Sequence, residues 1–272
     1  PYGDLIRDIS ELLMTEQSEL FFENKLNRLL YETLSTSEIL EIGKYINPLF
    51  KKEYITICLN LPGLDNRQFY SLQSDLKVQY QLRLRRYQNG GFIIFNYQER
   101  AEFDAALPGL RKLFHYYCNT YSSGISGAFE NAADFQQSIR QACSSLRIGI
   151  MLKQQWTYPD DLHIYNLLMA VHDNATLKNF YTMTLAPLIQ YEKRYSVDLI
   201  KTIETYLTCD GDYKKTAILL KQHENTIRFR INKAKSLLGM ENSHYKFIEQ
   251  VSLALKARSV EKFSVNRPPN GL

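Results

Sequence analysis

The sequence lacks the cysteine spacing of a metal or thiol-redox site. Its four cysteines are far apart, and none lies within three residues of another: Cys58, Cys118, Cys143 and Cys209. Zinc sites and redox motifs usually bring pairs of cysteines within a few residues of each other, so this spacing gives no sign of either. We therefore expect reduced thiols, with no metal and no cofactor.

Long hydrophobic runs are also missing. The longest apolar runs are far shorter than the roughly 20 residues that a membrane helix needs. The chain starts at Pro1 rather than at a methionine, and no basic-then-apolar leader follows. These absences predict a cytoplasmic chain without membrane contact. They also suggest a fragment that lacks whatever precedes Pro1.

Positively charged residues only slightly outnumber negatively charged ones. The formal net charge is +4, 23% of the residues are charged and 44% are hydrophobic. This is the composition of an ordinary globular protein, and it excludes extensive disorder. Such a balance does not by itself imply nucleic acid, so the location of the charges matters more than their sum. A length of 272 residues allows about two domains.

The spacing of apolar and turn residues predicts an α+β fold class, with strands interleaved with helices first and helices alone afterwards. Residues 1–35 are expected to form an N-terminal helical connector, because their leucines mostly recur at helical spacing. The connector either packs on its own domain or pairs two chains. Residues 36–153 form the mixed domain. Residues 154–262 form a helical domain without a convincing strand, and 263–272 a disordered tail.

A β-hairpin is predicted within residues 36–153. The β-branched run 54–61 has the pattern of a buried strand. Residues 78–87 alternate between apolar and polar side chains, and the turn Asn89-Gly90-Gly91 joins them to the apolar run 92–95. Residues 122–126 suggest another short strand. Helices are expected over Ser37–Ile46, over 99–118 and from Phe135 to Leu146.

The helical domain is divided by caps and a proline. Asp160 and Asp161 can cap a helix that starts at Leu162. A further helix over 175–191 is expected to bend or break near Pro187. Ser196 can cap the next helix, and a final helix is expected at about 243–258.

Residues 212–239 have the pattern of two short helices joined by a tight turn. Asp212 can cap a helix over about 212–220, and residues 221–223 form a short break. A second helix then covers about 224–238 and ends at Gly239, the usual residue at that position. Its apolar residues form one stripe spaced four, three and four apart: Ile227, Ile231, Ala234 and Leu238.

The charge of this helix pair is locally one-sided. From Lys214 to Lys235 there are seven Lys or Arg residues and one acid, Glu224. A helix fits the DNA major groove, where Asn, Thr and Arg reach base edges while nearby cations neutralise phosphates. The candidate groove contacts are Asn225, Thr226, Arg228 and Arg230. The candidate phosphate contacts are Lys214, Lys215, Lys221, Lys233 and Lys235. His223 either bonds a phosphate or closes the turn, and Arg230 could instead form a salt bridge that fixes the helix pair.

The same stretch resembles the C-terminal helix-turn-helix of the PucR/CdaR regulators, of the purine-catabolism and sugar-diacid type. That motif reads roughly A-x-x-L-x-x-H-x-N-T-[LIV]-x-[YF]-R-[LI]. The residues in register are Ala217, Leu220, His223, Asn225, Thr226, Ile227, Phe229, Arg230 and Ile231. Segments at 124–149, 185–191 and 199–207 also resemble the family. Glu224 departs from it, because a basic residue is common there. An acid favours the helix dipole but repels phosphate.

The resemblance implies that the middle domain is similar to the GGDEF nucleotide-cyclase fold. Residues 86–92 occupy the hairpin where such an enzyme has its Gly-Gly-acid-acid-Phe signature, but Phe92 and Ile93 directly follow the glycines. A cyclase needs carboxylates there to hold Mg²⁺ against the triphosphate. We therefore interpret residues 36–153 as a non-catalytic GGDEF-like domain.

A second group of acidic and histidine residues could be considered as metal ligands, but capping and solvation explain it better. Its members are Asp160, Asp161, His163, His172 and Asp173.

Taken together, the residues and the resemblance predict a sequence-specific, effector-responsive transcriptional regulator that is not an enzyme. Its partners would be double-stranded operator DNA, a second copy of the chain, because paired half-sites match a two-fold axis, and an unknown small-molecule effector. Two alternatives remain: a protein-interaction module with a basic helix, and a residual nucleotide-binding enzyme.

The missing carboxylates of the hairpin give a direct test. The purified chain, incubated with GTP and Mg²⁺, is expected to form no cyclic dinucleotide, because no side chain of the signature can hold the metal. Chromatography of the reaction mixture measures the product. Accumulation of cyclic dinucleotide with time would contradict the non-catalytic interpretation.

Overall fold

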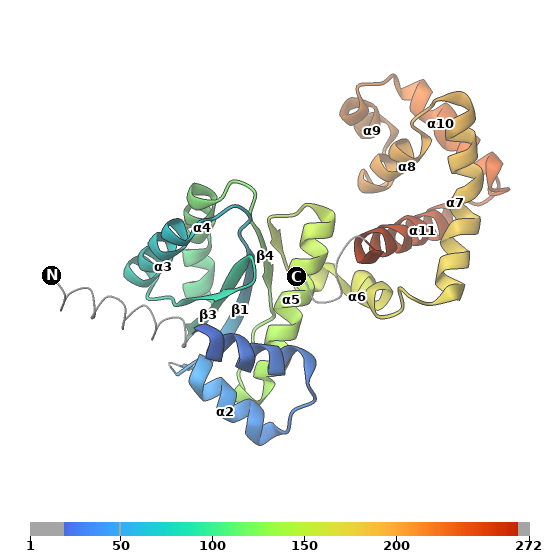
Figure 1. The fold of residues 1–272 in the computed structure, drawn as a ribbon. Helices are drawn as coiled ribbons and strands as arrows, with labels where there is room; N and C mark the ends of the chain where they lie inside the picture. The colour runs from blue at the N-terminus through green and yellow to red at the C-terminus, as the bar shows by residue number, and fades with distance from the viewer. Residues whose placement is uncertain (1–18, 49, 266–272) are drawn as a thin grey trace, which may run out of the picture. The chain divides into compact units, whose positions relative to one another are not determined.

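The computed structural model describes residues 19–48 and 50–265. The described chain forms two compact units that divide between His163 and Ile164. Unit 1 is a mixed α/β structure with a five-stranded sheet, and unit 2 is all-helical (Figure 1). The predicted fold class is thereby confirmed, while the domain limits at 35, 153 and 262 remain a prediction.

Unit 1 is built around a mixed sheet. Its strands lie in the order β2-β3-β1-β4-β5, and every pairing is antiparallel except that of β4 with β5. The elements of this unit, in chain order, are α2 (Thr36–Ile46), β1 (Glu53–Asn60), α3 (Asn66–Tyr80), β2 (Leu84–Tyr87), β3 (Gly90–Tyr97), α4 (Arg100–Tyr117), β4 (Ser122–Ile125), η1 (Ala132–Asp134), α5 (Phe135–Leu152), β5 (Trp156–Thr157) and η2 (Pro159–Asp161).

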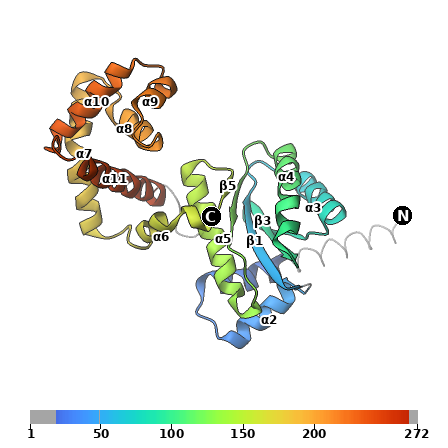
Figure 2. The same cartoon turned by 180° about the vertical axis from the view of Figure 1, so that it is seen from behind.

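Each face of the sheet buries its own hydrophobic cluster. Alternate residues of β1 point to opposite faces, as the two-residue period of a strand requires. Ile55 and Ile57 pack with α3 and α4, whereas Tyr54 and Cys58 pack with α2, α5 and the helical residues 19–31. The view from behind shows α5 along one side of the strands and α3 with α4 along the other (Figure 2). Every residue of β1 between its two ends is therefore buried.

The predicted β-hairpin is confirmed by the antiparallel pairing of β2 with β3, but the start of its first strand and one further expectation in unit 1 were wrong. The predicted strand over 78–87 overlaps the end of α3, which Asp65 caps through the backbone N–H of Gln68, and the real strand covers only Leu84–Tyr87. A few residues at the end of a helix happen to alternate between apolar and polar side chains, which mimics a strand. The expectation of no strand after residue 154 was also wrong, because Trp156 and Thr157 pair with β4. A two-residue strand carries no periodic signal.

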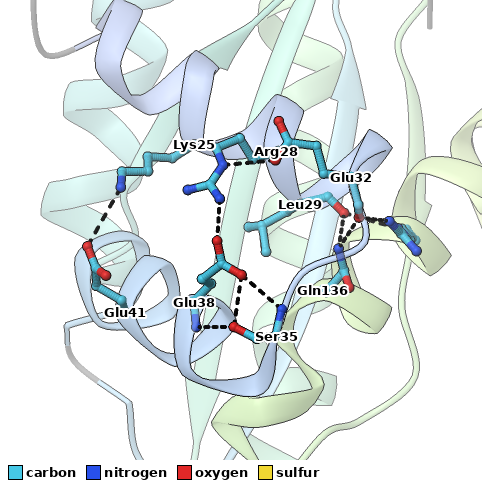
Figure 3. A network of polar contacts seen from close by, with 9 residues as sticks. Lys25, Arg28, Leu29, Glu32, Ser35, Glu38, Glu41 and Gln136 are labelled. Carbon is cyan, nitrogen blue, oxygen red and sulfur yellow. Dashed lines mark hydrogen bonds and ion pairs between the residues drawn. The ribbon is translucent and has the colours of Figure 1, made fainter.

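Residues 19–31 form a helix that packs on unit 1. Phe22, Leu26 and Leu29 are buried in the cluster beside α5. Side chains of α5 cap the end of this helix: Gln136 Nε2 and the Arg140 guanidinium both donate to the carbonyl oxygens of Leu29 and Glu32, at 2.7–3.0 Å (Figure 3). For residues 19–31 the structure thus shows packing on their own domain. Residues 1–18 of the expected connector lie outside the described residues.

The start of α2 completes this network. Ser35 and Glu38 form a capping box, and Glu38 also accepts a hydrogen bond from Arg28 at 2.6 Å (Figure 3). The backbone N–H and hydroxyl of Ser35, followed by Arg28, lower the pKa of Glu38 to about 2. The helix predicted over Ser37–Ile46 is confirmed.

Unit 2 contains the helices α6 (His163–Ala170), α7 (Ala175–Tyr195), α8 (Leu199–Thr208), α9 (Tyr213–Leu220), α10 (Glu224–Leu237) and α11 (His244–Val265). Pro187 lies inside α7, which continues past it, so the helix is not broken there. Ser196 does not cap α8. It ends α7 with a φ of 50°, and Asp198 precedes α8 instead. Residues 263–265 of the expected tail belong to α11, and 266–272 lie outside the described residues.

Gly124 sets the distance between the sheet and α5. A Cβ atom at this position would overlap the backbone of Ala142 and Leu146, so β4 and α5 approach as closely as their main chains allow. Gly127, three residues later, would meet only the flexible side chain of Gln141, at 3.4 Å.

Replacing Gly124 by alanine is therefore expected to destabilise unit 1 by about 3 kcal/mol, because the helix and the strand must move apart. Urea unfolding followed by the fluorescence of Trp156, the single tryptophan, reports on this unit. Gly127→Ala is the matched control and should shift the midpoint little. Equal midpoints for both variants would contradict the close-packing argument.

Candidate nucleic-acid interface

Helices α9 and α10 each begin at a residue whose side chain caps them. The Asp212 carboxylate accepts hydrogen bonds from the backbone N–H of Lys214 and Lys215, at 2.8 and 3.0 Å. These bonds, first that of Lys215, lower the pKa of Asp212. Lys221 is the C-cap of α9, with a φ of 52°, and α10 begins three residues later at Glu224. The predicted helix, break and helix are thereby confirmed.

His223 occupies the N-cap of α10. Its Nδ1 accepts a hydrogen bond from the backbone N–H of Asn225 at 3.2 Å, so the imidazole closes the turn. The residue is also exposed, which leaves its predicted phosphate contact untested.

One side of α10 is buried against the rest of unit 2. Ile227, Ile231 and Ala234 have no exposed surface, and Leu238, the fourth residue of the predicted stripe, is partly buried at the C-cap. Gly239 follows with a φ of 64°, the left-handed conformation that glycine adopts at helix ends. In α9, the small residue Ala217 is buried as well. Burial of the stripe fixes which side chains of α10 face outwards.

Arg228 is exposed, but its guanidinium is held locally. It donates to Glu224 Oε1 at 2.6 and 3.0 Å and lies over the ring of Tyr213, 4.3 Å from the centroid. The acid that departs from the family pattern thus pairs with a candidate groove residue one turn later.

Three other candidate cations reach towards neighbouring helices. Arg230 Nη1 donates to the buried hydroxyl of Thr202 in α8 at 3.0 Å, which joins the two helices by a hydrogen bond rather than the salt bridge considered above. Lys233 lies over the ring of Tyr191 in α7, and Lys235 over that of Phe247 in α11, at 5.3 and 5.8 Å from the centroids. All three are half-buried.

The remaining candidate DNA contacts are mostly exposed to solvent. Lys214, Lys215, Lys221 and Asn225 are exposed, and Thr226 is half-buried. Charge-based reasoning passed over Phe229, which is 65% exposed on the outer side of α10. A helical projection would have found it, since it follows buried Ile227 by two residues and therefore points about 200° away.

In the hairpin of unit 1, close packing leaves no room for side chains at the two adjacent glycines. Cβ atoms at Gly90 and Gly91 would overlap the main chain of Leu59 and of Arg85, respectively. Phe92 and Ile93 follow and are buried, so no carboxylate stands after the glycines. Across residues 19–48 and 50–265, no three His, Cys, Asp or Glu side chains are grouped as metal ligands would be.

The geometry of α8 to α10, with a capped tight turn and an outward basic helix, defines a helix-turn-helix DNA-binding domain. Residues 199–257 match the family described as the PucR C-terminal helix-turn-helix domain. The C-terminal unit of this chain therefore carries a DNA-binding domain of the PucR type, as the resemblance implied.

Relatives with a named function are regulators. The chain is 28% identical over 141 residues to the "Purine catabolism regulatory protein" of Bacillus subtilis, covering 50% of this chain and 26% of that protein. It is 19% identical over 258 residues to the "Proline-responsive transcriptional activator PutR" of the same organism, covering 89% and 63%. An "Uncharacterized protein" of Haemophilus influenzae is 26% identical over 263 residues, covering 88% and 67%.

The chain thus spans between about a quarter and two thirds of the length of these relatives. The two Bacillus subtilis relatives are named as a regulatory protein and a transcriptional activator, which agrees with the prediction of a regulator rather than an enzyme. Of the helices between residues 19 and 265, none combines the length and the apolar character needed to cross a bilayer.

The contact between Arg230 and Thr202 gives a prediction about the site itself. Arg230→Ala is expected to lower the stability of unit 2 by about 1 kcal/mol, because one hydrogen bond between α8 and α10 is lost. Thr202→Val removes the same bond and also the one that the Thr202 hydroxyl donates to the Asp198 carbonyl, so it should cost somewhat more. Thermal unfolding by circular dichroism measures both.

The double variant separates positioning from direct DNA contact. If Arg230 acts only through Thr202, the two single variants weaken duplex binding equally and the double variant adds nothing. A loss of binding for Arg230→Ala alone would show that the guanidinium also contacts DNA.

Proposed function

We propose that this chain is the DNA-binding and signal-relaying part of a transcriptional regulator, which binds operator DNA by inserting α10 into the major groove. The observation that carries the proposal is the exposed side of α9 and α10, where cations surround a helix whose opposite side is buried. Helix-turn-helix domains dock their second helix in this way.

The exposed lysines support a backbone-binding role. Lys214 and Lys215 lie in the first turn of α9, and Lys221 lies at its end, so they flank the outer side of the pair. Lysines in such positions neutralise phosphates and release counterions. Groove contacts by Asn225, Thr226, Arg228 and Arg230, and phosphate contacts by the lysines and His223, are part of this proposal.

Homodimerisation and effector control are also proposed. A closed two-fold dimer presents two copies of α10 to half-sites that are related by the same symmetry. The effector would be a small molecule. The GGDEF-like domain would relay the signal without catalysis, and the regulator would act in the cytoplasm.

A protein-interaction module with the basic helix as its surface is the second candidate, favoured by the exposed apolar side chain of Phe229. Salt-dependent preference for one duplex over random DNA separates the two candidates. The hairpin without carboxylates gives no support to a residual nucleotide-binding enzyme.

Removal of Lys214 and Lys215 tests the backbone contacts. The Lys214→Ala/Lys215→Ala variant is expected to bind every duplex more weakly and to reduce the slope of log affinity against log salt by about two, one per lost phosphate contact. Fluorescence anisotropy with labelled duplexes at several salt concentrations measures the slope. Lys112→Ala, an exposed charge change on α4 of unit 1, should leave it unchanged. A slope that stays constant in the double variant would exclude these lysines from the DNA backbone.

A further inference from the structure

The middle of the outer side of α10 is uncharged. Four residues of this helix are exposed at helical spacing, four, three and four residues apart: Asn225, Phe229, Asn232 and Ser236. We propose that these four residues, the reading stripe, determine sequence specificity, and that they select half-sites containing A·T base pairs.

The rotation of the helix supports this assignment. At about 100° per residue, the reading stripe falls within about 60° of arc, centred roughly opposite the buried Ile227, Ile231 and Ala234. Side chains on this arc point most directly away from unit 2. In a helix that enters a groove, they reach furthest towards the base edges.

The cations beside the reading stripe are occupied elsewhere. Arg228 is held by Glu224 and Tyr213, and Arg230 by Thr202. Lys233 and Lys235 lie over aromatic rings of α7 and α11. Arg and Lys are the side chains that pair with the acceptor edge of guanine. Their present contacts hold them at the flanks of the outer side, so the groove contacts proposed above for Arg228 and Arg230 fall beside its centre, which has no guanine reader.

The chemistry of the reading stripe matches A·T pairs. An Asn amide forms paired hydrogen bonds with N6 and N7 of adenine, and an apolar side chain contacts the 5-methyl group of thymine. Asn225 and Asn232 are exposed amides of the first kind, and Phe229, 65% exposed, is the apolar group between them. Covering a large, solvent-exposed apolar side chain with a methyl group removes apolar surface from water, which favours binding.

This inference rests on the proposed function, so the experiment separates the two. The chain is first used to enrich duplexes from a randomised pool, and its affinity for the enriched duplex is compared with that for a scrambled one. Wild type should enrich half-sites with A·T pairs. Replacing each thymine of the half-site by uracil, which removes only the methyl group, should weaken wild-type binding about fourfold for the contacted methyl.

Phe229→Ala should bind the thymine and uracil duplexes equally, because its partner for the methyl group is gone. Asn225→Ala and Asn232→Ala should each lose about tenfold in discrimination on the enriched duplex, and lose less when 7-deazaadenine replaces adenine. The matched control is Met183→Ala, since Met183 on α7 is 77% exposed and lies outside the outer side of α10. It should keep the fourfold thymine preference.

Two outcomes overturn the inference while leaving the proposed function in place. Retained thymine preference in Phe229→Ala would remove Phe229 from the groove, and enrichment of G·C half-sites would contradict the base class. Failure of wild type to prefer any duplex would overturn the proposed function itself. Melting temperatures of all variants identify any loss that comes from unfolding.

Discussion

Burial of Ile227, Ile231 and Ala234 determines most of what the C-terminal unit can do. Once this stripe is sealed against the neighbouring helices, the rotation of α10 is fixed, and with it the side chains that face outwards. The turn before the helix leaves little freedom, since Lys221 adopts a left-handed conformation and His223 caps the backbone N–H of Asn225. The surface proposed to read DNA is therefore a consequence of core packing in this unit.

Local signals in the sequence predicted the helix pair well. Asp212, the break after Leu220 and Gly239 act through bonds and backbone angles within a few residues, so their roles can be inferred from spacing. The orientation of the cations could not be inferred in this way. Arg230 donates a hydrogen bond to Thr202, twenty-eight positions earlier, and Lys233 lies over the ring of Tyr191 in another helix. Contacts of this range depend on how helices pack, which the periodicity of one helix does not contain.

The mixed unit shows the same limit. The antiparallel hairpin was predicted because its turn and its apolar runs are adjacent, yet part of α3 was predicted as a strand. The glycine pair of the hairpin is explained by the close approach of Leu59 and Arg85. Packing alone therefore accounts for this glycine pair, so two adjacent glycines on a hairpin are weak evidence for chemistry.

The capping of residues 19–31 by α5 has a mechanical consequence. Gln136 and Arg140 grip two carbonyl groups of the preceding helix from successive turns of α5, through hydrogen bonds of 2.7–3.0 Å. Sliding that helix along its axis by one turn would break all of these bonds at once, and small displacements would instead carry α5 along. The connection between α5 and residues 19–31 is therefore stiff towards small displacements and breaks abruptly under large ones.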